Sequence, residues 1–282
     1  MSAPALEVPH RHEDFVEVAD RVFVRRHRFF DSNTTLVVGD GGCLVIDTRT
    51  THEQGLDLID AIRRITPHPW TVVNTHHHFD HVFGNSAFLP CDIWGHERCA
   101  EILRTEGEAM RLRMVGNATA AGRPDITEQL ERLVVAPPNR TMNEYVELQV
   151  GERAVQLHHL GRGHTDNDVV VVVPDCRVLH AGDLVEEGAP PSFNDSYPLD
   201  WVDAMSRVAA LSDGVVVPGH GAVVDRDYVE QQGAQIAAVV KLARETHADG
   251  VLLESAARSG PFAEEANLDA LERAHAQLNG KL

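Results

Sequence analysis

The sequence has few cysteines, and their spacing fits neither a disulfide framework nor a cysteine-based zinc site. No two of them form a CxxC pair, and the four stand at Cys43, Cys91, Cys99 and Cys176. In a cytosolic chain of this length, scattered cysteines of this kind are free, partly buried thiols more often than bridges or ligands. We therefore expect any metal to be bound by other residue types.

Basic residues are also scarce. The chain of 282 residues has 25 Lys and Arg against 43 Asp and Glu, which gives a formal net charge of -18. An acidic surface repels phosphate backbones, and no run of Lys or Arg forms a local basic patch. This composition argues against a nucleic acid as partner.

Long apolar runs are missing as well. No run approaches the roughly 20 residues that a helix needs to cross a membrane. The opening stretch MSAPALEVPHRHEDF lacks the basic region and following apolar region of a secretory signal. We expect a cytoplasmic protein that binds a small-molecule substrate and no membrane, with a homodimer left open as its assembly.

What the sequence does contain is 43% hydrophobic residues in short strand-like and helix-like patterns. Residues 14–47 predict two hairpins, the second turning at Gly-Asp-Gly-Gly. Helical spacing predicts helices at 51–65, over most of 97–132 with a break at 117–125, at 199–211, and from 226 to the end. Further strands are predicted at 70–75, 91–95, 145–150, 154–160, 168–174, 177–183 and 214–221, with a loop at 136–141.

Strands come first and helices then alternate with strands, which predicts a layered α/β fold with sheet packed between helices. We find no internal repeat and no long linker. We place a single α/β domain at residues 14–245, a helical insertion or lid within it at 97–135, and a helical tail at 246–282.

One polar pattern recurs: His or Asp follows directly after a β-branched strand. It does so at four strand ends, with His76, His78, Asp80 and His81 at the first, then His164, Asp183 and His220, each of these three preceded by glycine. Rigid sheets place chemistry at strand ends. Imidazole nitrogens and carboxylate oxygens suit zinc, and seven such groups suit two ions better than one.

The stretch NTHHHFDH at 74–81 has a plainer interpretation too. Taken alone, a His-rich tract is as consistent with adventitious metal binding at a surface. The three later residues at strand ends favour a built site. In such a site we expect the side chain of His77, between two ligands, to point elsewhere.

These residues resemble the metallo-β-lactamase fold superfamily. The HxHxDH motif is complete as His76-x-His78-x-Asp80-His81, and His164, Asp183 and His220 follow in the family's order. The resemblance covers about residues 20–225. It implies an αββα sandwich with metals at one edge of the two sheets.

The resemblance also implies a division of the ligands. Site one would hold its ion with His76, His78 and His164, and site two with Asp80, His81 and His220, with Asp183 bridging them. The cofactors would be two Zn²⁺, with iron or manganese as alternatives. Asp183 departs from the true β-lactamases, which generally have Cys or Ser there, and is similar to the glyoxalase II and lactonase branches and to RNase Z. The acidic helical tail makes glutathione thioester specificity doubtful.

The function that this resemblance implies is a dinuclear zinc hydrolase. A metal-bridging hydroxide would cleave an ester, thioester, lactone or amide of a small molecule, with Asp80 as ligand and proton acceptor. No GxSxG nucleophile motif is present. Two alternatives stay open: a mononuclear iron persulfide dioxygenase-like oxidoreductase, and a non-catalytic metal-binding protein.

The sequence gives weaker indications of the residues that line the substrate pocket. The segment 184–200 follows Asp183 and should lie over the site. Candidate pocket walls are Phe79, Phe193, Tyr197 and Trp201, for which ordinary packing beneath a loop is the competing interpretation. Met110 and Met114 share one helix face and predict core packing or an apolar lid.

Overall fold

A computed structural model of the protein describes residues 14–249 and 252–282. The first 13 residues, on which the expectation of no signal sequence depends, lie outside this range. Among the described residues, no helix is long and apolar enough to cross a membrane.

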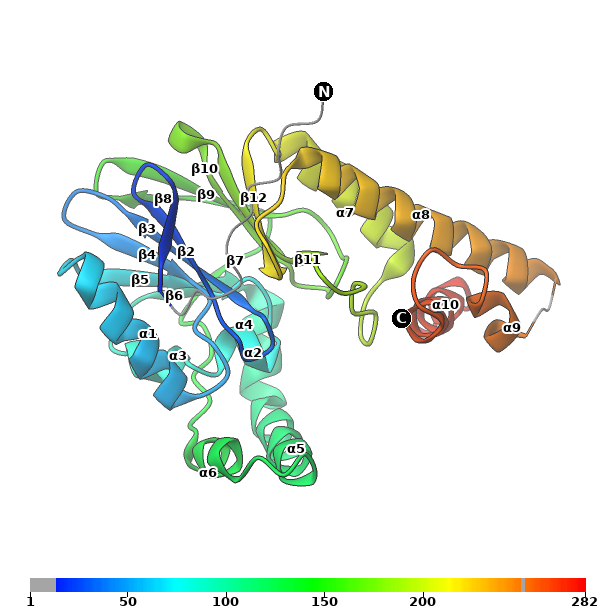
Figure 1. The fold of residues 1–282 in the computed structure, drawn as a ribbon, viewed down its shortest axis with the longest axis horizontal. Helices are drawn as coiled ribbons and strands as arrows, with labels where there is room; N and C mark the ends of the chain where they lie inside the picture. Colours follow the sequence, from blue (N-terminus) through cyan, green and yellow to red (C-terminus); the bar gives the residue numbers. More distant parts are fainter. Residues whose placement is uncertain (1–13, 250–251) are drawn as a thin grey trace.

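Two sheets form the centre of the molecule (Figure 1). The first sheet is antiparallel from β1 to β4 and parallel from β4 to β7, in chain order. Its strands are β1 (Val16–Ala19), β2 (Val22–Arg26), β3 (Asn33–Val38), β4 (Cys43–Ile46), β5 (Trp70–Val73), β6 (Ile93–His96) and β7 (Arg140–Met142). The second sheet has the order β12-β11-β10-β9-β8, antiparallel except for β11 and β12. Its strands are β8 (Tyr145–Val150), β9 (Arg153–His159), β10 (Val169–Val173), β11 (Val178–Glu186) and β12 (Val215–His220).

Helices cover the outer faces of both sheets. α1 (His52–Ile65) packs on the first sheet, with α3 (Asn85–Phe88) beside it, and α7 (Pro198–Leu211) and α8 (Arg226–Asp249) pack on the second. β10 is buried at all five positions because Val171 faces the other sheet while Val170 faces these helices. The fold is the expected αββα sandwich.

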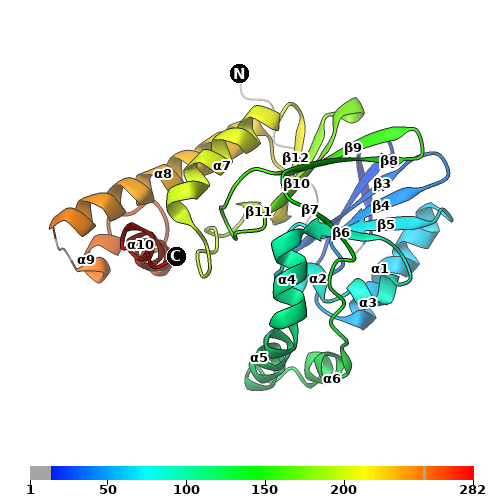
Figure 2. The same ribbon diagram turned by 180° about the vertical axis from the view of Figure 1, so that it is seen from behind.

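The expected insertion is a group of three helices that projects from the first sheet (Figure 2). They are α4 (Glu97–Thr105), α5 (Gly107–Ala120) and α6 (Pro124–Arg132). The break expected at 117–125 is shorter than predicted, because α5 continues to Ala120 and Pro124 opens α6. The loop predicted at 136–141 is wrong in part, since β7 begins at Arg140 and pairs with β6.

The C-terminal region is not one continuous helix, as the sequence pattern suggested. α8 is followed by α9 (Leu253–Ala257) and α10 (Glu264–Leu278), with a turn at 258–263. Buried residues of α9 and α10, including Ala257 and Leu271, join the core formed by α7, α8 and the second sheet. The tail boundary expected at 245/246 falls inside α8, so the tail is an integral part of this layer.

Candidate metal centre

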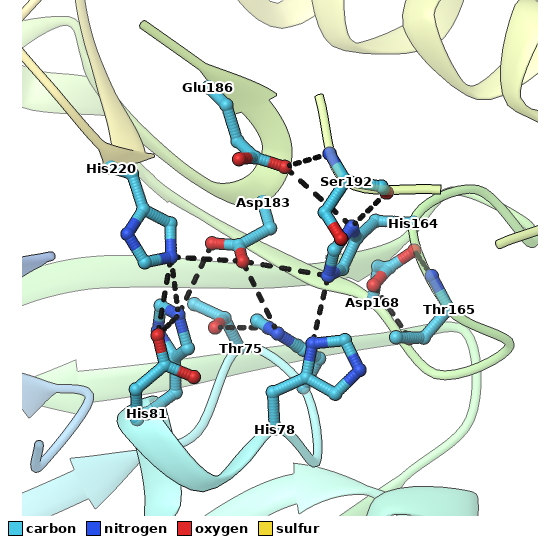
Figure 3. A network of polar contacts seen from close by, with 12 residues as sticks. Thr75, His78, His81, His164, Thr165, Asp168, Asp183, Glu186, Ser192 and His220 are labelled. Atoms are coloured by element: carbon cyan, nitrogen blue, oxygen red, sulfur yellow. Dashed lines mark hydrogen bonds and ion pairs between the residues drawn. The ribbon is translucent and has the colours of Figure 1, made fainter. Parts of the chain in front are cut away.

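All seven predicted ligands meet at one edge of the two sheets. Figure 3 labels five of them: His78, His81, His164, Asp183 and His220. The loop after β5 carries two of them and the short helix α2 (Phe79–Val82) two. His164 lies in the loop between β9 and β10, Asp183 within β11, which continues to Glu186 beyond the expected strand end, and His220 at the end of β12. Their ligand atoms form two groups, each within 4.8 Å: His76, His78, His164 and Asp183, and Asp80, His81 and His220. The geometric groups coincide with the ligand sets that the resemblance implied.

Asp183 lies between the two groups. Its Oδ2 is 3.5 Å from His164 Nε2 and 3.6 Å from His76 Nε2 in the first group. The same oxygen is 3.2 Å from His220 Nε2, while Oδ1 is 3.3 Å from His81 Nε2. A carboxylate in contact with both groups has the position that a bridging ligand requires.

Backbone carbonyls hold the outer nitrogen of two ligand rings. His220 Nδ1 donates to the carbonyl of Phe30 at 2.7 Å, and His164 Nδ1 donates to that of Ser192 at 3.2 Å. Because a carbonyl only accepts, a proton lies on each Nδ1, and each Nε2 faces the centre. Outer hydrogen bonds of this kind fix the ring orientation of metal-binding histidines.

Asp47 does the same for two further ligands. Its carboxylate accepts from the amide and hydroxyl of Thr75 and from His81 Nδ1, each at 2.8 Å. Since the Thr75 hydroxyl donates to Asp47, it accepts from His76 Nδ1 at 3.0 Å. Asp47 stands at a φ of 65°, a left-handed conformation that costs energy and is typical of functional positions. The sequence marked Asp47 only as the end of a strand.

Asp195 was not predicted, and it orients the remaining ligand. It lies 3.0 Å from His78 Nε2, which turns His78 Nδ1 toward the centre. Burial raises the pKa of Asp195, but hydrogen bonds from His77 and His78 outweigh it and hold that pKa well below its usual range. His77 belongs to neither ligand group; it forms a third cluster of metal-competent groups with His78 and Asp195, lines the cavity, and contacts Asn167.

The donor atoms fit a cation. The buried atoms His76 Nε2 and Asp183 Oδ1 have no hydrogen-bond partner. His164 Nε2 lies 2.9 Å from His78 Nδ1, where outer hydrogen bonds direct both lone pairs inward. Burying such groups without compensation is costly, and a divalent metal bound by imidazole and carboxylate would satisfy them together.

Burial and the neighbouring carboxylates shift the pKa values of the ligand histidines in opposite directions. Burial lowers the pKa of His164 to about 3, which leaves this ring neutral, the form that binds metals. Burial also lowers the pKa of His220, but Asp183 and Asp80 outweigh that effect and raise it to about 10. The carboxylates thus draw positive charge to this edge of the sheets.

The glycines that precede His164, Asp183 and His220 stand where a side chain would clash with a neighbouring residue. A Cβ on Gly219 would lie 1.8 Å from Asp183 Oδ1, and one on Gly182 would lie 2.9 Å from Thr75 Cβ. A Cβ on Gly163 would meet the side chain of Leu184 at 2.4 Å. The glycines of the sequence pattern therefore stand where neighbouring segments of the chain approach closely at the site.

A cavity of about 540 Å³ opens over the ligands. Phe79 lies on its lining, as do Met110 and Met114 of α5. Phe30, which was not predicted, is 45% exposed and packs edge-to-face on Phe79 with ring centroids 5.2 Å apart. From the segment 184–200, polar residues such as Ser192 face the cavity, which places this segment over the site.

The other predicted walls lie elsewhere. Phe193 is 1% and Trp201 0% exposed, and both belong to the core with α7 and α8. Trp201 packs behind His164, with ring centroids 5.7 Å apart. Tyr197 is off the cavity lining and stacks under Arg162. Because the segment turns its large apolar side chains toward the helices, its contribution to the cavity lining is mostly polar, with Ala189 as the apolar side chain among the described lining residues.

Comparison with known proteins gives a consistent picture. The family model described as metallo-beta-lactamase superfamily matches residues 27–220. The acyl-coenzyme A thioesterase MBLAC2 of Gallus gallus is 27% identical over 217 residues, covering 71% of this chain and 77% of that enzyme. A metallo-beta-lactamase type 2 of Bacillus cereus is 30% identical over 94 residues, which are 32% of this chain and 37% of that enzyme.

Solved structures share the fold. A metallo-beta-lactamase from Pontibacter korlensis aligns with a TM-score of 0.64 at 19% identity, covering 79% of this chain and 98% of its own. The sec-alkylsulfatase Pisa1 from Pseudomonas sp. aligns with a TM-score of 0.75 at 17% identity, covering 95% of this chain and 50% of its own. The chain thus spans half the length of that sulfatase.

Proposed function

Since the chain belongs to the metallo-β-lactamase superfamily and is a metal-dependent hydrolase, we propose that it uses two zinc ions to cleave an ester, thioester, lactone or amide bond of a small molecule. The observation that carries this proposal is the position of Asp183, whose two oxygens contact histidines of both ligand groups. The similarity to an acyl-coenzyme A thioesterase supports the thioester among these bonds.

The residues of the chain would divide the work by position. One ion would be held by His76, His78 and His164, the other by Asp80, His81 and His220, with Asp183 shared. When bound, zinc would polarise the carbonyl of the substrate and make a hydroxide nucleophile available at neutral pH.

Asp80 has a second role in this proposal. It lies on the cavity lining, 3.4 Å from His220 and 3.6 Å from His81. A carboxylate that is both a ligand and open to the cavity can accept the proton released as water attacks. Asp47 and Asp195 meanwhile keep the ligand rings oriented.

The proposal is tested first by metal content. Untagged protein is expressed in medium supplied with both zinc and iron, and metal per chain is measured by mass spectrometry. About two zinc ions per chain are expected from the ligand set. One iron with little zinc would favour the alternative of a mononuclear iron persulfide dioxygenase-like oxidoreductase. The absence of any stoichiometric metal would overturn the ligand assignment.

We predict that His164→Ala lowers turnover by at least about 100-fold with the fold intact, because loss of a direct ligand should exceed the 10- to 100-fold cost of losing an outer partner. Turnover is measured on a panel of esters, lactones and thioesters, and the fold by circular dichroism. His158→Ala is the matched control, since His158 lies on β9, off the lining of the cavity. Retained activity in His164→Ala would remove the two-metal proposal.

A further inference from the structure

We propose that Arg113 of α5 binds a carboxylate carried by the substrate, so that the enzyme prefers acyl compounds with an anionic group beyond an apolar segment. This inference rests on the proposed function, because it takes the metal centre as the place where the bond is cleaved. It adds the substrate class that the rest of the cavity selects.

Among the residues that the structure describes, Arg113 is the only lysine or arginine that lines the cavity. Met110, Arg113 and Met114 stand at i, i+3 and i+4 and therefore share one face of α5. That face is the one the insertion presents to the metal centre, since all three residues lie on the lining with the ligand histidines. A single guanidinium is thus placed in a cavity that is otherwise lined by acidic, polar and apolar residues and by the ligand histidines.

Within residues 14–249 and 252–282, Arg113 has no hydrogen bond or ion pair. No acidic residue stands three or four positions from it on the helix, where Ala109, Met110, Gly116 and Asn117 are found. Arg111 on the same helix contrasts with it, because it makes two hydrogen bonds to Glu108 and one to the carbonyl of Leu130. Arg111 holds the insertion together, whereas Arg113 is available to a ligand.

The carboxylates of the cavity are already committed to other partners. Asp31 pairs with Arg26 at 2.6 Å, Asp195 with His78, and Glu186 accepts from the amide of Ser192. In a chain with a net charge of -18, an anionic substrate meets a repulsive field away from the metal centre. A free guanidinium, which matches a carboxylate with two parallel donors, would supply the local attraction.

An apolar surface lies between the metal ligands and Arg113. Phe79 is the neighbour of two ligands in the sequence and packs in the same cluster as Met110 and Met114, which flank Arg113. Phe30 extends this surface through its contact with Phe79. An extended acyl chain would lie against it, and methionine side chains adapt to different chain lengths.

The test compares matched substrates on metal-loaded protein. One series is the mono-4-nitrophenyl esters of straight-chain dicarboxylic acids from succinic to suberic acid, and the other is the 4-nitrophenyl esters of the monocarboxylic acids of equal length. We expect Arg113→Gln to raise KM for the carboxylated series by about tenfold, as for loss of one charge-assisted hydrogen bond, with kcat little changed. KM for the neutral series should stay the same.

Arg104→Gln is the control, because it removes the same charge from the insertion at an exposed position off the cavity lining. It should leave both series unchanged. Equal effects of Arg113→Gln on both series, or no preference of the unmodified enzyme for the carboxylated esters, would overturn the proposal.

Calorimetry separates this inference from the proposed function. Suberate, without any bond to cleave, should bind the metal-loaded protein about tenfold more tightly than it binds Arg113→Gln, whereas octanoate should bind both equally. If the protein hydrolyses neither series, the proposed function fails while suberate binding still decides the role of Arg113. Equal binding of suberate to both proteins would reject the arginine site on its own.

Discussion

At the scale of single residues, the site depends on positions that lack a side chain as well as on the ligands. Gly219 stands beside His220 at the end of β12, and the Asp183 carboxylate occupies the space where its Cβ would be. The bridging position of Asp183 therefore requires a residue without a side chain on the neighbouring parallel strand.

We predict that Gly219→Ala displaces the Asp183 carboxylate and weakens metal binding about 10- to 100-fold, the range observed when the support of a ligand is lost. Affinity is measured by competition with a chromogenic chelator. Gly116→Ala is the control, because a Cβ there meets nothing within 4 Å and exposed helical Gly→Ala changes stabilise by up to about 1 kcal/mol. Unchanged affinity in Gly219→Ala would show that Asp183 finds its place without this gap.

The ligands could be predicted from the sequence because each follows a strand in a fixed pattern, and the structure brings all seven together. The outer partners could not. Asp195 is one of several acidic residues in 184–200, and its contact with His78 spans 117 positions of the chain. Phe30 reaches the cavity only through the turn that presents its carbonyl to His220. Such contacts depend on the tertiary fold and leave no local periodicity to read.

At the scale of elements, strands and helices with strong periodicity were predicted with boundaries close to those observed. The pattern failed where pairing or packing decides the structure. β7 has three residues and exists because it pairs with β6, and the turn at 258–263 exists because α10 folds back on α8 and α9. Neither has an alternation long enough to identify from sequence alone.

One element boundary depends on pH. His96 ends β6 and caps α4, with its Nδ1 accepting from the amide of Arg98 at 3.2 Å. Burial lowers the pKa of His96 to about 4, and the neighbouring ring of His159 adds to the effect. The folded protein thus keeps this ring neutral, while the unfolded chain protonates it below its ordinary pKa of about 6.5.

The resulting stability is complete above pH 6.5 and is lost as the pH falls toward 4. His96→Asn keeps a capping side chain but cannot be protonated. We predict that between pH 7 and pH 4.5 the unmodified protein loses on the order of 1–3 kcal/mol more stability than His96→Asn. Urea unfolding of chelator-treated protein, which excludes proton competition at the metal centre, measures the difference. Equal losses would mean that His96 does not titrate in this range.

At the scale of the whole molecule, the C-terminal helices support the segment that covers the site. Arg273 of α10 donates to the carbonyl of Ser196 at 2.9 Å, and Gln277 accepts from the amide of Leu199 at 2.8 Å. Phe262, in the turn before α10, packs on Phe193 with ring centroids 5.8 Å apart. The region expected to be only an acidic tail therefore anchors the loop that carries Asp195. Figure 1 shows α9 and α10 beside the end of α8 that lies away from the sheets.

We predict that Arg273→Gln loosens this loop, because one hydrogen bond worth about 1 kcal/mol is removed from its base. Amide exchange of residues 192–199 should accelerate about fivefold, a factor that corresponds to that energy. Asp195 would then hold His78 less firmly, so metal affinity should fall by a smaller factor than in Gly219→Ala. Arg258→Gln, which removes an exposed pairing with Glu264, is the matched control. If exchange in 192–199 is the same in both variants, the C-terminal layer supports the core without reaching the site.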